Sequence, residues 1–126
     1  MSELRRTIDL PQARAIERVT ETLAEEGFGV LTEIDVAAVL KKKLDVDRRP
    51  YRILGACSPA FAHRALEANP EVGTLLPCNV VVYEGEQGET IISAVDPATL
   101  LPADSPELEA IAGEVRSRLV RALAAV

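Results

Sequence analysis

The segment that most constrains the fold is residues 50–63, where a strand pattern leads straight into the start of a helix. Residues 51–56 have the length and apolar content of a strand. Ser58 and Pro59 then supply an N-cap residue and a first-turn proline, the residue types that most often begin a helix. With only Cys57 between the two patterns, the chain has to turn there from sheet to helix. Such units favour a fold in which helices pack on a sheet.

The same alternation of strand and helix patterns continues along the whole chain. Predicted strands cover residues 4–8, 28–34, 51–56, 75–83 and 90–95, and predicted helices cover residues 11–26, 36–44, 59–68 and 106–123. The turn at residues 84–88 joins two of the strands into a hairpin. We therefore predict an α+β fold over residues 1–126. It is a single two-layer domain with about five strands in a mixed, mostly antiparallel sheet, packed with about four helices.

Local residue chemistry indicates which residues begin these helices and which they bury. Asp35 is expected to cap the second helix, at residues 36–44, and Ser105 is expected to cap the last helix, at residues 106–123. In the strand at residues 28–34, even-numbered residues should share one face. The apolar residues expected to be buried by the second helix are Val36, Val39, Leu40 and Leu44.

Composition excludes several classes of function. At 126 residues and 48% hydrophobic content, the chain is long enough for one domain with a real core. A net charge of −6 with scattered basic residues argues against nucleic acid as a partner. No apolar run approaches the ~18 residues of a membrane span, and the first residues do not resemble a secretion signal. We expect a soluble, cytoplasmic protein with no membrane partner, in which Cys57 and Cys78 are reduced thiols.

The predicted architecture also indicates self-association. Helices on one side of the sheet would leave its other face uncovered, with Leu31, Leu54 and Val81 or the alternate residues on it. Two-fold pairing of identical chains is the commonest way to cover such a surface. We therefore predict a homodimer.

Four blocks of sequence resemble the domain of unknown function 302 family. They are residues 28–35, residues 49–57 followed by Pro59 and His63, residues 76–84 and residues 93–97. The resemblance is strongest over residues 28–97. It implies a compact α/β domain that usually stands alone, is often dimeric, and has no agreed reaction. It supplies no catalytic residues that could be carried over to this chain.

The best candidate site lies at the strand-to-helix turn. Cys57 directly precedes the Ser58-Pro59 helix start, where free N–H groups and the helix dipole are expected to lower the thiol pKa. The only histidine, His63, follows four or five residues into that helix and could act as a base. The competing interpretations are that Cys57 packs as a small apolar residue and that His63 pairs on the surface with Glu67.

Two binding hypotheses use neighbouring residues. Cys57, His63 and Cys78, with Glu33 or Asp96 as a fourth ligand, could form a metal site, but their spacing matches no known metal motif and we predict none. The carboxylates of Glu33 and Asp96 could equally cap helices or close turns. A small anionic ligand could bind the backbone N–H groups of residues 59–62. Either Arg52 or Arg64 could supply the positive charge beside it.

The leading functional hypothesis is a homodimeric module that binds a small molecule or a protein partner and performs no chemistry of its own. The alternative is a thiol-dependent redox or transfer enzyme, or a metal-handling protein, that uses Cys57 and His63. The sequence names no cofactor, and it leaves open whether the protein is an enzyme.

Overall fold

The computed structural model describes residues 3–102 and 105–126. Within them, five strands form one sheet in the order β1-β5-β4-β3-β2, with every neighbouring pair antiparallel. The strands are β1 (Arg5–Ile8), β2 (Gly29–Asp35), β3 (Tyr51–Cys57), β4 (Cys78–Glu84) and β5 (Thr90–Ala94). The helices are α1 (Gln12–Glu25), α2 (Val36–Leu44), α3 (Pro59–Ala68), α4 (Pro97–Leu100), α5 (Pro106–Ala124) and the 3-10 helix η1 (Pro70–Leu75).

The predicted α+β class with five strands is confirmed, with two differences in detail. The sheet is wholly antiparallel, and the short helices α4 and η1 add to the four predicted ones. In the part of the chain that the structure describes, no helix is both long and apolar enough to cross a membrane.

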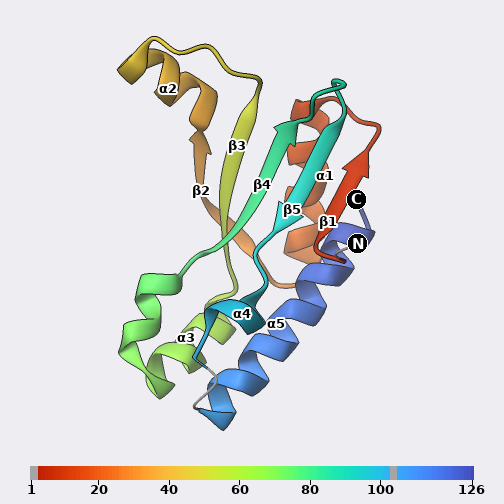
Figure 1. Cartoon of the computed structure of the whole chain (residues 1–126). Helices are drawn as coiled ribbons and strands as arrows, with labels where there is room; N and C mark the ends of the chain where they lie inside the picture. The colour runs from red at the N-terminus through yellow and green to blue at the C-terminus, as the bar shows by residue number, and fades with distance from the viewer. Residues whose placement is uncertain (1–2, 103–104) are drawn as a thin grey trace.

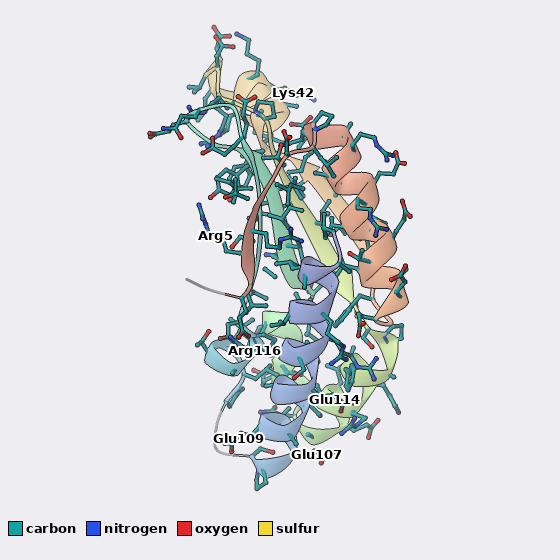
Figure 2. All side chains as sticks on the ribbon, turned by 90° about the vertical axis from the view of Figure 1, so that its right-hand side faces the viewer. Arg5, Lys42, Glu107, Glu109, Glu114 and Arg116 are labelled. Carbon is teal, nitrogen blue, oxygen red and sulfur yellow. The ribbon has the colours of Figure 1, made fainter. Side chains whose placement is uncertain are left out.

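Helices α1 and α5 cover one face of the sheet (Figure 1), and they lie together on one side of the strands in the turned view of Figure 2. Ser105 caps α5 as predicted, because its hydroxyl accepts a hydrogen bond from the Leu108 N–H at 3.3 Å. The core between the layers contains Leu23 of α1, Leu54 of β3 and Leu119 of α5, all fully buried.

The strand register assigns each residue of the sheet to one of two faces. Leu54 lies opposite Val80, and both are fully buried on the helix-covered face. Ile53 lies opposite Val81, and alternation places both on the other face. This second face is called the open face below. Of the residues predicted for the uncovered face, Val81 lies there, whereas Leu54 is in the core and the alternate residue Ile53 lies on the open face.

A β-bulge in β2 contradicts the regular alternation predicted for residues 28–34. Val30 pairs with Ala56 and Thr32 with Gly55, so the register shifts between them and Leu31 is the extra residue. Leu31 is 68% exposed. After the bulge, Ile34 lies on the open face, while Val30 remains on the face covered by helices.

Helix α2 does not pack as predicted. Asp35 caps it, accepting a hydrogen bond from the Ala38 N–H at 3.0 Å, but the expected burial of Val36, Val39, Leu40 and Leu44 is wrong, since no residue of α2 is buried. No loop separates β2 from α2, because Asp35 both ends the strand and caps the helix. The helix therefore continues past the edge of the sheet, apart from the layer formed by α1 and α5 (Figure 1).

Candidate functional site

Three of the sequence-predicted site residues line one small cavity. Cys57 ends β3, Ser58 occupies the N-cap position of α3, and Cys78 begins β4. They meet because Ala56, the neighbour of Cys57, pairs with Cys78 in the sheet. The cavity is apolar and about 30 Å³ in volume, and α3, α4 and α5 close it. It has room for a water molecule or two, well below the ~300 Å³ at which ligand pockets usually begin.

The chemistry expected of Cys57 is not supported by its surroundings. Burial raises the pKa of the Cys57 thiol, which contradicts the lowering predicted from the helix start. Burial also raises the pKa of Cys78, and the nearby Cys57 adds to that effect. His63 is exposed on α3 and is not among the residues that line the cavity. The cavity therefore holds both thiols without the imidazole that would activate one of them.

Both thiols should accordingly react slowly with iodoacetamide in the folded protein at pH 7.5. Since only the thiolate is nucleophilic, a raised pKa leaves less of it at that pH than in an ordinary cysteine. Mass spectrometry should show little modification of Cys57 and Cys78 in buffer, rapid modification of both in urea, and a native rate that rises only at higher pH. Rapid native labelling of Cys57 would instead support the thiol-enzyme hypothesis.

The two carboxylates proposed as metal ligands lie elsewhere. Asp96 caps α4 through the Ala98 N–H at 3.0 Å and pairs with Arg116 Nε at 3.3 Å. Glu33 pairs with Arg52 in the sheet region beyond Leu54, away from the cysteines. Across residues 3–102 and 105–126, no three His, Cys, Asp or Glu side chains are grouped so that they could hold a metal ion.

The anion site predicted at the start of α3 is also not assembled. Arg52 lies near the opposite end of β3 from Cys57 and Ser58. Arg64 points its guanidinium to Glu114, at 3.9 Å, and over the ring of Phe61, at 5.6 Å. Arg52 therefore lies away from the first turn of α3, and Arg64, although close to that turn, is paired with Glu114 and the Phe61 ring.

A larger hollow lies where the start of α1 faces β2 and α2. Its volume is about 650 Å³. We call it the charged groove, after Glu33, Asp35, Arg48 and Arg52, which line it together with Gln12. Glu33, Asp35 and Arg52 lie on the face of the sheet that the helices cover elsewhere, because Glu33 pairs with Leu54 and Asp35 with Arg52. The groove thus opens where the helix layer ends.

The charges in the groove hold one another in place. Arg52 forms an ion pair with Glu33 through Nη1 and with Asp35 through Nη2, the latter at 3.2 Å. The Asp35 side chain is also held by the hydrogen bond through which it caps α2. All three side chains are more than a third exposed, so the pairs contribute little to stability. Their main effect is to fix the orientation of these groups before any ligand arrives.

Gln12 is the unusual residue of the groove. Its Oε1 and Nε2 atoms are both buried, and neither has a hydrogen-bond partner among the residues that the structure describes. A buried amide without partners costs about 1–3 kcal/mol. The sequence reasoning missed this residue because a glutamine in the first turn of a helix carries no local signal of that kind.

Comparison with known proteins gives a family but no activity. The model of a family described as a domain of unknown function, DUF302, matches residues 4–126. A crystal structure of an uncharacterized conserved protein DUF302 from Bacillus stearothermophilus is 36% identical, with 98% of each chain covered and a TM-score of 0.86. No curated protein matches the chain.

Proposed function

This chain belongs to the DUF302 family, a domain of unknown function, and from its geometry we propose a soluble, homodimeric module that binds a small ligand in the charged groove. In this proposal the module performs no chemistry on the ligand. The observation that carries it is the unpartnered amide of Gln12 in a groove whose Arg52 is already held by two carboxylates.

The position of Gln12 favours binding over a structural role. An apolar side chain of similar size would avoid the cost of two buried, unpaired polar atoms. Residues that lower stability in this way are typical of sites shaped for function. In this proposal the Gln12 side chain turns into the groove on binding, where a ligand that offers both a donor and an acceptor supplies the partners that the amide lacks.

The lining residues indicate the class of ligand. Two arginines, Arg48 and Arg52, are balanced by the carboxylates of Glu33 and Asp35. The formal charge of the groove is therefore close to zero, which favours a neutral or zwitterionic molecule over the small anion expected from the sequence. The volume of about 650 Å³ falls within the range of ~300–1,000 Å³ found for small-molecule sites.

Two further parts of the proposal rest on other residues. The homodimer is supported by the exposed apolar residues of β2, α2 and the segment after α2, which include Leu31 and Leu44. A cytoplasmic location fits the two cysteines, both of which are free thiols.

Gln12→Met should raise the free energy of unfolding by about 1 kcal/mol, because it replaces the unpaired amide with an apolar side chain of similar length. Chemical denaturation of the wild type and the variant measures the change. Gln87→Met is a suitable control, since Gln87 is exposed in the turn between β4 and β5 and should change stability little. A clear loss of stability in Gln12→Met would show that the amide has a structural partner.

Native mass spectrometry of the protein purified from its own host tests the function itself. We expect a two-subunit species with extra mass that disappears on denaturation, and no extra mass on Gln12→Met prepared in the same way. If neither the wild type nor the variant carries extra mass, binding in the groove is contradicted. If both carry the same extra mass, the ligand binds elsewhere on the protein.

A further inference from the structure

We infer that the ligand of the charged groove is a short peptide with free ends, whose ammonium group lies in a second hollow beyond Gln12. The second hollow is called the acidic hollow, after Asp9, Glu84 and Glu89, which line it. The inference rests on the proposed ligand site and adds the chemical class of the ligand and the direction in which it lies.

The acidic hollow adjoins the charged groove at Gln12. Its volume is about 590 Å³, and Gln12 belongs to the lining of both hollows. In Figure 1, the start of α1 lies beside the turn that joins β4 and β5, at the end of the sheet from which α2 projects. One ligand can therefore extend from the groove into the acidic hollow past Gln12.

Glu84 of the acidic hollow lies beside the turn that leads into α1. Glu84 pairs with Thr90 across β4 and β5, and the Thr90 hydroxyl donates a hydrogen bond to the Leu10 carbonyl oxygen at 2.6 Å. Leu10 comes just before the first turn of α1. The strand register therefore fixes this carboxylate next to the boundary that Gln12 forms between the two hollows.

The charge of the acidic hollow favours a cation. Among the residues that the structure describes, no lysine or arginine lines it, and its three carboxylates have a formal charge of −3. Glu84 and Glu89 are half-buried, and charges interact more strongly there than in bulk water. An ammonium group offsets this charge and brings three N–H donors to the carboxylate oxygens. The hollow is thus suited to the amino end of a ligand.

A peptide group matches the amide of Gln12. Nε2 of a glutamine donates and Oε1 accepts, and neither atom of Gln12 has a partner among the described residues. A peptide unit offers one N–H donor and one C=O acceptor. A single peptide group beside Gln12 can therefore pair with both atoms once the side chain has turned towards the ligand.

The start of α1 is suited to the carboxylate end of the peptide. Pro11 occupies the N-cap position without a side-chain capping bond, and the first turn contains no acidic residue. The first N–H groups of a helix have no acceptor within the helix, and the helix dipole attracts negative charge to them. Ala13 of this turn lines the charged groove but not the acidic hollow. The two ends of the ligand would thus lie on opposite sides of Gln12.

The strand register indicates the length of the ligand. Arg52 of the groove pairs with Val82 on β4, and Glu84 lies two residues further along that strand. With ~4.8 Å between strands and ~3.4 Å per residue, the Cα atoms of Arg52 and Glu84 are roughly 8 Å apart. An extended chain spans about 3.3–3.6 Å per residue. Two or three residues therefore match the distance between the groove and the acidic hollow.

The first test compares three forms of one probe, trialanine, in two-dimensional NMR titrations of the wild-type protein. Trialanine should shift the signals of residues that line both hollows and the side-chain amide signal of Gln12. N-acetyl-trialanine has no ammonium group and should bind about tenfold more weakly, because charge-assisted hydrogen bonds are lost. Trialanine amide, which lacks only the carboxylate, should bind more weakly but still shift the signals of the acidic hollow.

The second test removes one carboxylate of the acidic hollow. Glu84→Gln should weaken the binding of trialanine about tenfold and leave that of N-acetyl-trialanine unchanged. Glu86→Gln is the matched control, because Glu86 is exposed in the turn after β4 and does not line the hollow. This control should bind both probes as the wild type does. The NMR spectra of the variants show at the same time whether each is folded.

The outcomes separate this inference from the proposed function. Equal affinities for trialanine and N-acetyl-trialanine, or an equal effect of Glu84→Gln on both probes, would overturn the placement of the ammonium group. If trialanine shifts no signals at millimolar concentration, the peptide class is wrong. The proposed groove site then still stands if the wild type carries extra mass that Gln12→Met lacks. Without that extra mass, the proposed function is contradicted as well.

Discussion

Leu54→Ala is expected to lower the free energy of unfolding by about 2–5 kcal/mol, because it leaves a cavity in a packed core. Leu54 is fully buried opposite Val80. Ile53→Ala, one residue earlier in β3, should cost much less in the monomer, because Ile53 lies on the open face and is only partly buried. Urea denaturation of both variants measures the difference.

The two variants have to be compared in the same oligomeric state, since association would add to the stability of any variant that pairs. Light scattering at the protein concentration used for denaturation checks this. Equal losses of unfolding free energy would contradict the assignment of the two residues to opposite faces.

The elements were predictable from the sequence because their signals are local. Helix periodicity identified α1 and α5, and the N-caps Asp35 and Ser105 are where the residue types indicated. The face of each strand was less predictable. Alternation shows that Leu54 and Ile53 differ, but only packing against α1 and α5 determines which of them is inside. The bulge at Leu31 then reverses the alternation within β2.

Helix α2 shows a second limit of periodicity. An apolar stripe on a helix favours burial of the stripe, but it does not indicate which surface, if any, covers it. The residues of α2 were therefore predicted to pack in their own chain, whereas the structure leaves Val39 and Leu44 exposed. The direct passage from β2 to α2 was already implied by Asp35 as the cap, but the direction that the helix takes is seen only in three dimensions.

The candidate site was predicted only in part for similar reasons. The turn at Cys57 is a local feature, and the structure does bring Cys78 to the same cavity. The predicted fall in the pKa of Cys57 considered the helix dipole but not burial, which raises the pKa of this thiol. The charged groove depends on strand register, which pairs Asp35 with Arg52 across 17 residues of sequence. No spacing motif encodes that proximity.

Gly55→Ala is expected to cost about 1–3 kcal/mol, although it adds a single methyl group. A Cβ at this position would clash with Thr32 Oγ1 and lie 2.8 Å from Pro77 Cγ. Gly113→Ala is the matched control, because a Cβ there meets nothing within 4 Å and the residue is inside α5. That change should stabilise the protein by up to about 1 kcal/mol, as alanine favours helix more than glycine does.

The clash can be assigned by combining Gly55→Ala with Thr32→Ala. If the contact with Thr32 contributes, the loss caused by Gly55→Ala should be smaller in the Thr32→Ala background, and the remainder reflects Pro77. Equal losses in both backgrounds would assign the whole effect to Pro77. Gly55 is paired with Thr32 just after the bulge, at the start of the stretch of β2 that carries Glu33 and Asp35. A close fit at this glycine therefore maintains the register on which the charged groove depends.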